Sequence, residues 1–435
     1  MNPPLRHDDF ASPTRPPPPA AAAPGYPFAA RARDLKRSEI REFLRHAGAP
    51  GMISLAGGLP AAELFDRDGL AAASAAGLRE RPAAALQYGM TEGQPRLREA
   101  LTALMGERGI NVTANAAAAR DGLLVTTGSQ QAIDLLARIF IEPGDTVVVE
   151  RPCYLAAVQA FALAGARLRT LPTDADGACV ERLDDCLGSD GGPPPKFVYL
   201  VSTFANPTGA TLSRERRLAL LRWAVRHRVF VIEDDPYGEL RFAGDAVPPL
   251  LALAAEVPGA ADWCGYLSSL SKIVAPGLRV GWMQLPPAIA EQAGRVKQTL
   301  DLHTSSLAQE IAAAYLASGR LPAVLERARA RYRAQAEALA DALQRRFGER
   351  LQFALPEGGM FLWARFVDGT DTGALLPAAL AQSVIYVPGA AFYADAPDRA
   401  TLRLSYAGIP PEQADEAAAR LLRAVASAAS TGSAE

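Results

Sequence analysis

The chain has 435 residues, of which 49% are hydrophobic, so it is long enough for about two or three domains with substantial cores. A net charge of −2 and the lack of a long basic run argue against nucleic acid or an anionic membrane as partners. Four scattered cysteines show no metal-binding spacing and are expected to be reduced thiols: Cys153, Cys179, Cys186 and Cys264.

The first 30 residues contain nine prolines and no periodic apolar pattern, which predicts a disordered Pro/Ala-rich arm. A signal peptide needs an unbroken apolar stretch, and prolines and an HDD stretch interrupt it here, so we expect a cytoplasmic protein. No later apolar run is long enough to cross a bilayer.

From about residue 120, short apolar runs alternate with longer amphipathic stretches such as SQQAIDLLARIFI. The apolar runs lie at 123–128, 146–150, 196–201, 229–235, 264–270 and 279–285. Strands of this kind, separated by helices, predict a mostly parallel sheet covered on both faces, which we assign to a large α/β domain over residues 61–304.

After about residue 305, long helices rich in Ala, Arg, Leu and Glu give way to short strands such as MFLWARF and TLRLSYA. This change predicts a smaller α+β domain over residues 305–428. Residues 31–60 are too short to support a core of their own, so we expect them to join the smaller domain.

Polar residues follow several predicted strands, where ligands bind in doubly wound sheets. Gly128, Ser129 and Gln130 open a helix after the first strand and predict a phosphate site, although such a Gly-Ser helix entry taken alone is more often an ordinary cap. Asn206 precedes Pro207 in FANPTG, which holds it in an extended or turn conformation at a strand end. A plain Asn-Pro turn is the alternative. Asp234 ends another strand, where a buried acid needs a cation or metal unless it caps a helix.

Lysine is rare in this chain, which carries 45 basic residues but only Lys36, Lys196, Lys272 and Lys297 as lysines. We expect the other three to be exposed by chance, but Lys272 has informative neighbours. A desolvated lysine can attack a carbonyl, which an arginine cannot do. Ser269, Ser271 and Arg279 suit a phosphate monoester, so the group predicts a phosphorylated aldehyde such as pyridoxal phosphate.

Nine motifs in order carry a family resemblance: ISLAGGLP, LQYGMTEGQPRLREA, TTGSQQAIDL, NPTG, EDDPYGELRF, SLSKIVAPGLRVGW, DLHTSS, PEGGMFLW and LRLSY. The chain resembles the fold-type I, class I/II pyridoxal-phosphate aminotransferases, and among them the 2-aminoadipate and kynurenine (multi-substrate) group. The resemblance covers all but the arm. It implies an α/β large domain with a mostly parallel seven-stranded sheet, a smaller α+β domain and a homodimer with shared active sites.

The resemblance implies that Lys272 forms the Schiff base with the cofactor and shuttles a proton. Asp234 would pair with the pyridine nitrogen, Tyr237 and Asn206 would bind the phenolic oxygen, and Tyr154 would stack on the ring. Asp235 is then a structural acid. The residues implied for the phosphate are Gly128, Ser129, Gln130, Ser269, Ser271, Arg279 and, from a second subunit, Tyr88.

For the substrate, the resemblance implies that Arg403 clamps the α-carboxylate with help from Asn206, although taken alone Arg403 would suit a surface ion pair. Gly58 and Leu59 would lie near the substrate. Arg41, in a segment similar to a mobile lid helix, matches an arginine that meets a distal carboxylate. Arg365 is a weaker candidate because it lies outside the matching motifs.

The expected reaction is ping-pong transamination of an L-amino acid (2-aminoadipate, aromatic or branched-chain) with a 2-oxo acid such as 2-oxoglutarate. Two alternatives stay open. One is another pyridoxal-phosphate reaction, β-lyase or decarboxylase, on the same fold. The other is an aminotransferase-like effector-binding module of a transcription factor, which the short arm disfavours because such proteins carry a winged helix at the N-terminus.

Overall fold

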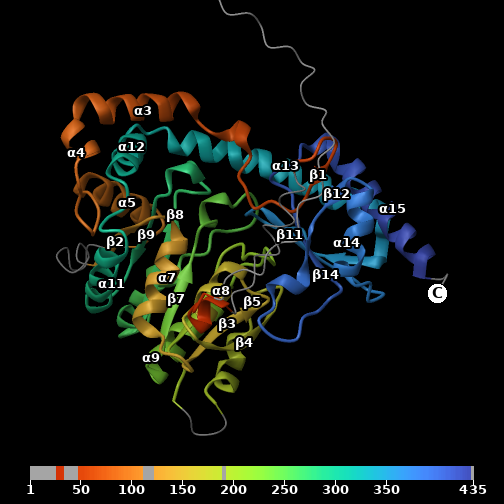
Figure 1. Cartoon of the computed structure of the whole chain (residues 1–435), viewed down its shortest axis with the longest axis horizontal. Helices are drawn as coiled ribbons and strands as arrows, with labels where there is room; N and C mark the ends of the chain where they lie inside the picture. Colours follow the sequence, from red (N-terminus) through yellow and green to blue (C-terminus); the bar gives the residue numbers. More distant parts are fainter. Residues whose placement is uncertain (1–25, 34–47, 111–121, 189–192, 433–435) are drawn as a thin grey trace, which may run out of the picture. The chain divides into compact units, whose positions relative to one another are not determined.

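In the computed structural model, the described residues are 26–33, 48–110, 122–188 and 193–432 (Figure 1). The chain divides into two compact units, residues 1–36 and 37–435. In the first unit, a single turn of helix, α1, spans Ala30–Arg33. Most of the predicted arm, and residues 34–47 of the predicted lid segment with Arg41, lie outside the described residues, so their roles stay predictions.

The large sheet of the second unit has eight strands among the described residues, in the order β2-β9-β8-β7-β6-β3-β4-β5. The strands are β2 (Leu123–Thr126), β3 (Thr146–Arg151), β4 (Arg167–Asp174), β5 (Gly177–Ala178), β6 (Phe197–Leu200), β7 (Phe230–Asp234), β8 (Cys264–Ser269) and β9 (Gly281–Gln284). The resemblance implied seven strands. The two-residue β5 extends the edge beyond β4 by an antiparallel pairing.

The directions of the strands bring the ends that precede the predicted site residues to one edge of this sheet. The strands β8, β7, β6, β3 and β4 pair in parallel, whereas β9 runs antiparallel to both of its neighbours, β2 and β8. The carboxyl ends of the parallel strands therefore lie beside the beginning of β9. Arg279, which comes just before β9, is placed with residues that follow the other strands.

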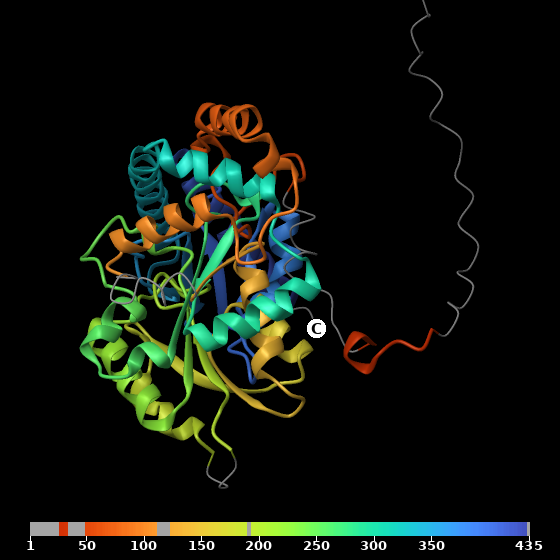
Figure 2. The ribbon, with the colours of Figure 1, turned by 90° about the vertical axis from the view of Figure 1, so that its left-hand side faces the viewer.

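Alternation along the strands gives the sheet a core on each face, as predicted. Val147 and Val149 point into one core, with helices α7 (Ser129–Phe140), α8 (Leu155–Leu163) and α11 (Pro287–Leu300). Val148 points into the other core, with α9 (Arg214–His227) and α10 (Leu250–Leu253). Figure 2 shows helices on both sides of the strands.

A second, antiparallel sheet has the order β10-β11-β14-β13. Its strands are β10 (Leu351–Phe353), β11 (Phe361–Phe366), β13 (Val387–Pro388) and β14 (Thr401–Ser405), with helices α13 (Leu321–Phe347), α14 (Thr372–Ala381) and α15 (Ala414–Gly432). A short strand β1 (Ile53–Ser54) pairs with β12 (Val384–Ile385), next to these elements. The predicted domain boundaries stay predictions.

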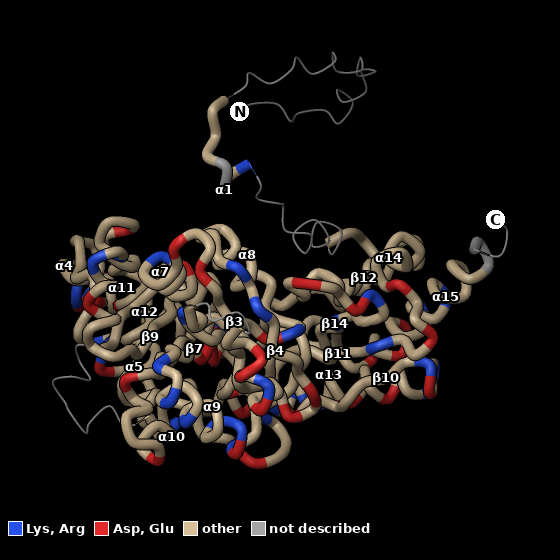
Figure 3. The backbone as a smooth tube through the Cα atoms, turned by 90° about the horizontal axis from the view of Figure 1, so that it is seen from below, with Lys and Arg blue, Asp and Glu red and all other residues tan. Residues whose placement is uncertain are grey.

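Four further helices lie together: α3 (Arg67–Glu80), α4 (Pro82–Leu86), α5 (Pro95–Glu107) and α12 (Ser306–Ala317). Lysines and arginines alternate with acids over the second unit in Figure 3. Among the residues whose structure is described, no helix combines the length and the apolar character that a bilayer-spanning helix needs.

The prediction that the other lysines are exposed by chance is wrong for Lys297, whose side chain is fully buried. On α11 it follows Ala290 and Ala293 at helical spacing, so it continues the buried face of that helix. Lys196 is 41% exposed and pairs with Asp145, as expected for a surface lysine. Lys36 lies outside the described residues.

Candidate active site

The two sheets each contribute to one cluster of predicted site residues. Asp234 is the last residue of β7 and Ser269 the last of β8, and Asn206 follows β6. Arg403 lies in β14 of the second sheet, and its Nη1 donates to the Asn206 Oδ1 at 2.8 Å. This hydrogen bond brings together residues almost 200 positions apart in the sequence.

Asp234 is a buried carboxylate with one unused oxygen. Its Oδ2 accepts a hydrogen bond from the Tyr199 hydroxyl at 2.7 Å, whereas Oδ1 is buried and has no partner among the described residues. Burial raises the pKa of Asp234 to about 7, against the smaller lowering effect of the Tyr199 hydrogen bond. The free oxygen suits a donor that carries positive charge.

Lys272 presents an amine in a half-buried place. Its Nζ donates to the Gly58 carbonyl at 2.7 Å. Burial lowers the pKa of Lys272 to about 8, and the positive charges of Arg403 and Arg279 lower it further. A sizeable share of neutral amine is therefore present near neutral pH, which is the form that attacks a carbonyl.

Arg403 is a buried cation, 3% exposed, without an acidic partner among the residues described. Besides Asn206, it donates from Nη2 to the Ala56 carbonyl at 2.7 Å, and its buried Nε has no partner there. Its guanidinium carbon lies 4.2 Å from the Phe361 ring centroid and 5.0 Å from that of Phe392. Burial lowers the pKa of Arg403 to about 10. Such a planar cation can take a carboxylate.

Two predicted tyrosines complete this cluster. Burial raises the pKa of Tyr154 to about 12, with a further rise from the nearby charge of Asp234. Tyr237 is buried as well, and burial followed by the neighbouring Tyr154 raises its pKa. The Tyr237 ring meets the Phe361 ring edge-on, with centroids 5.9 Å apart.

The residues predicted for a phosphate also lie together. Gly128 is the N-cap of α7 with φ 77°, and a Cβ there would lie 2.6 Å from the Arg279 Nη2. The same Nη2 donates to the Thr127 carbonyl at 3.2 Å. The Ser269 hydroxyl donates to the Ser271 hydroxyl at 2.7 Å. A helix N-terminus, hydroxyls and an exposed guanidinium thus form an anion cradle.

Other predicted residues are at the margin of this cluster. Ser129 and Gln130 are in the first turn of α7, half-buried and exposed respectively. Tyr88 is 79% exposed, and its ring contacts that of His303 rather than the cluster. Leu59 is 64% exposed, while a Cβ on Gly58 would lie 3.2 Å from Phe361. Arg365 pairs with Asp398 at the surface.

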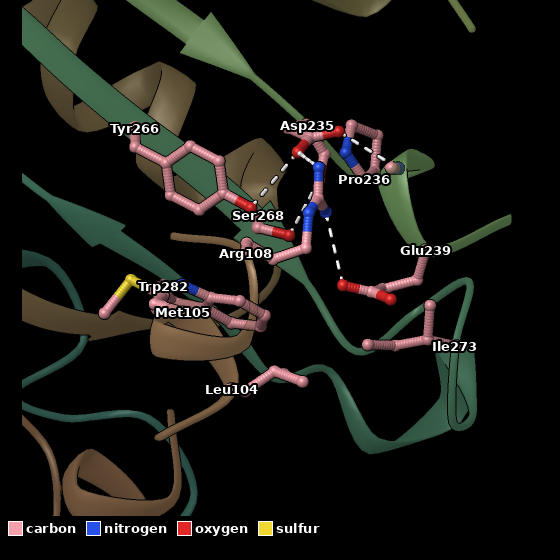
Figure 4. A pocket seen from close by; sticks show the side chains of 11 residues that line it. Leu104, Met105, Arg108, Asp235, Pro236, Glu239, Tyr266, Ser268, Ile273 and Trp282 are labelled. Atoms are coloured by element: carbon pink, nitrogen blue, oxygen red, sulfur yellow. Dashed lines mark hydrogen bonds and ion pairs between the residues drawn. The ribbon is translucent and has the colours of Figure 1, made fainter. Parts of the chain in front are cut away.

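Sequence reasoning missed Tyr199, which lies within the apolar run of β6 and whose only signal was a hydroxyl in a buried strand. Asp235 makes contacts of the kind expected for a structural acid. Its Oδ2 accepts from the Arg108 Nη2 at 2.8 Å and from the Tyr266 hydroxyl at 3.2 Å, and its Oδ1 accepts from the Gly238 N–H. Figure 4 shows these contacts in a small pocket, where they fix the turn that carries Tyr237.

Comparison with known proteins identifies the family. Residues 64–421 match aminotransferase class I and II. The chain belongs to this family. The aromatic-amino-acid aminotransferase 1 of Thermococcus litoralis is 38% identical over 92% of this chain and 94% of its own length. The 2-aminoadipate transaminase of Thermus thermophilus is also 38% identical, over 92% of this chain and 96% of its own length.

Among solved structures, Pyrococcus horikoshii kynurenine aminotransferase in complex with PMP is 37% identical and aligns with a TM-score of 0.85, over 92% of this chain and 97% of that one. The predicted fold class is confirmed, as are the enzyme class and the cofactor. This class I/II aminotransferase is a pyridoxal-phosphate-dependent enzyme of fold type I.

The residues present fit pyridoxal phosphate. The unused Oδ1 of Asp234 can accept from a protonated ring nitrogen, and the amine of Lys272 can condense with an aldehyde. The anion cradle around Gly128 and Arg279 can receive the phosphate. The ring nitrogen, the aldehyde and the phosphate of the cofactor therefore each have a complementary group on the chain.

Proposed function

We propose that these residues form the active site for amino transfer between an L-amino acid and a 2-oxo acid. Bound pyridoxal phosphate supplies a carbonyl that condenses with amines and a protonated ring that withdraws electrons from Cα. Asp234 holds the proton on the ring nitrogen. Asn206 and Tyr237 bind the phenolic oxygen, and Tyr154 covers one face of the ring.

Lys272 moves the proton. With the cofactor and substrate bound, the free Lys272 Nζ would take the proton from the substrate Cα and would be the group that gives it back. The depressed pKa of this lysine supports the role, because the amine must be neutral to accept a proton near pH 7. A second 2-oxo acid then takes the amino group by the reverse steps.

The observation that carries the substrate class is the buried, acid-free guanidinium of Arg403. It suits the α-carboxylate that every amino acid and 2-oxo acid shares. For the side chain we propose donors of the aromatic and 2-aminoadipate types, on the strength of relatives with those names, with branched-chain donors as a further group and 2-oxoglutarate as acceptor. Gly58, Leu59 and Arg41 are proposed to meet the substrate.

A panel of amino donors tests this function through the visible absorption of the cofactor. We expect L-phenylalanine, L-kynurenine and L-2-aminoadipate to convert the spectrum from the pyridoxal to the pyridoxamine form, and 2-oxoglutarate to restore it. Phenethylamine, which has the phenylalanine side chain without the carboxylate, is expected to fail. Ammonia or carbon dioxide released without transfer to the oxo acid would instead favour a lyase or a decarboxylase.

The carboxylate assignment is tested in the same assay with Arg403→Lys. An ammonium cannot make the planar, two-pronged contact, so kcat/KM for donors and acceptors alike is expected to fall by about 10²-fold or more. Arg365→Lys is the matched control, because Arg365 lies on the neighbouring strand β11 and pairs with Asp398 at the surface. Equal effects of the two substitutions would contradict the assignment.

We further propose that the enzyme works as a homodimer. A group of exposed apolar residues supports this, because such patches mark interaction sites on soluble proteins. The group, which we term the apolar patch, consists of Leu86, Tyr88, Met90, Leu300 and Leu302. His303 joins its two segments through the ring contact with Tyr88. In this arrangement the partner subunit's Tyr88 reaches the phosphate of the neighbouring site.

Mixed dimers test the shared site. Sedimentation of the wild-type protein should give twice the 46.0 kDa chain mass. Lys272→Ala should be inactive, and Tyr88→Ala should bind the cofactor about tenfold more weakly. In a hybrid dimer, one site combines Lys272 of the Tyr88→Ala subunit with Tyr88 of the Lys272→Ala subunit. Mixing the two variants should therefore create sites that both bind the cofactor tightly and are active. The activities are compared at a pyridoxal phosphate concentration near the wild-type Kd, where the Tyr88→Ala parent is mostly unloaded. A mixture that is no more active there than the separate parents would refute the sharing.

We place the enzyme in the cytoplasm. All four cysteines are free, and three of them, Cys153, Cys186 and Cys264, are buried. Unpaired buried thiols are typical of proteins in a reducing compartment. Fractionation of cells that produce the native protein would test the assignment.

A further inference from the structure

Lys297 is a buried lysine for which the amino-transfer reaction has no use. Its Nζ donates to both oxygens of Asp301, at 2.7 and 3.0 Å, and to the Gln131 Oε1 at 3.1 Å. A compact ammonium can donate in three directions to these acceptors, whereas a planar guanidinium would need more room. This explains why a lysine occurs here in a chain whose basic residues are mostly arginine.

The two partners of Lys297 in turn hold Thr127. The Gln131 Oε1 accepts from the Thr127 N–H at 2.8 Å, and the Asp301 Oδ2 accepts from the Thr127 hydroxyl at 3.2 Å. A further bond, from the Gln131 Nε2 to the Asp301 Oδ2 at 2.6 Å, ties the partners to each other. Removing the Lys297 ammonium would leave Asp301 without this cation and take one donor from each of its oxygens, while Oδ2 would keep its bonds from Thr127 and Gln131.

Thr127 is the residue directly before Gly128, the N-cap of α7. Its carbonyl accepts from the Arg279 Nη2, so Thr127 also orients the guanidinium that faces the cradle. A Cβ on Gly281, at the start of β9, would lie 2.7 Å from the Gly128 carbonyl carbon and 2.8 Å from the Ser129 nitrogen. The loop is thus packed closely on its other side, so small shifts of Thr127 pass directly to the anion cradle.

We propose that Lys297 is a positioning residue for the phosphate of the cofactor. It does not touch the phosphate. It fixes Asp301 and Gln131, which hold Thr127 and through it the cradle of Gly128 and Arg279. This inference rests on the proposed role of that cradle in phosphate binding. It also links the cradle to Leu300 and Leu302 of the apolar patch, which flank Asp301 and which we propose to lie at the dimer interface.

Cofactor binding by the apoprotein tests the proposal, with pyridoxal phosphate and phosphate-free pyridoxal compared in parallel. Lys297→Met keeps the length of the side chain but removes its donors and charge. We expect about a tenfold or greater rise in the Kd for pyridoxal phosphate, because charged hydrogen bonds are lost behind the cradle, and little change for pyridoxal. Lys196→Met is the control, since Lys196 is a surface lysine paired with Asp145.

The Kd for pyridoxal divided by the Kd for pyridoxal phosphate separates a positioning role from general damage to the site. This ratio should fall when only the binding of the phosphate is weakened. If Lys297→Met weakens the binding of both ligands equally, or of neither, this ratio stays at the wild-type value. The role of Lys297 is then merely structural and the proposal is overturned. Should the methionine variant fail to fold, Asp301→Asn tests the same link with a smaller change, and the same fall in the ratio is expected. A wild-type protein that binds both ligands equally would instead overturn the proposed cradle.

Discussion

In the Lys272→Arg variant, turnover is expected to fall by at least about 10³-fold, although the positive charge is kept. A guanidinium cannot lose its proton at working pH, so it can neither condense with the cofactor carbonyl nor accept the Cα proton. Wild-type Lys272 is suited to both steps because burial and the neighbouring charges of Arg403 and Arg279 lower its pKa to about 8.

Two measurements check this result. Single-turnover absorption with L-phenylalanine reports the proton transfer, and borohydride reduction followed by peptide mass mapping reports the covalent bond to residue 272. Lys196→Arg should leave both signals unchanged. If the turnover of Lys272→Arg stays within tenfold of the wild-type value, Lys272 takes no part in the chemical steps, whatever its contacts.

The second large effect is expected for Asp234→Asn. The asparagine side chain has nearly the same shape as aspartate but cannot hold a proton on the ring nitrogen. Turnover should fall by about 10³-fold or more, because a neutral ring withdraws electrons poorly. The Tyr199 hydroxyl can still donate to the amide oxygen, so the geometry of the site should survive. Stopped-flow absorption with a saturating donor separates this loss of rate from any loss of cofactor binding.

Asp234→Asn should also raise the free energy of unfolding of the cofactor-free protein at high pH, and the size of this gain depends on pH. The pKa of Asp234 is about 7 in the folded chain, against an ordinary value of 3.8. Between these values the folded state binds more protons than the unfolded state, so this group lowers stability as the pH rises from about 4 to 7. The buried negative charge then costs stability at higher pH.

Urea unfolding of the two apoproteins measures this difference. At pH 5 the folded Asp234 is neutral but the unfolded side chain is ionised, so about 1.6 kcal/mol of the linkage effect is already present. This roughly offsets the cost of the extra amide donor of Asn, and the free energies of unfolding should nearly agree. At pH 8 the Asn variant should be more stable by roughly 1–3 kcal/mol, because the pKa shift corresponds to about 4 kcal/mol and the extra amide donor costs part of it. A wild-type apoprotein that is the more stable of the two at pH 8 would contradict a poised, unpaired carboxylate.

Local sequence determined much of this enzyme. The alternation of apolar strands with amphipathic helices was enough to predict a covered, mostly parallel sheet, because strand and helix periods are properties of a few neighbouring residues. Family motifs then singled out Lys272, Asp234 and Arg403, whose side chains have few alternatives for their chemistry. The structure places all three in one cluster.

Tertiary structure alone decided how these groups are poised. Nothing local in the sequence distinguishes an exposed strand arginine from the buried, acid-free Arg403, and nothing local places Lys297 behind the cradle. Tyr199 meets Asp234 only because β6 and β7 pair side by side. Burial and charge pairing are sums over neighbours from distant segments, and those sums, rather than residue type, set the pKa values and the free hydrogen-bonding groups of the site.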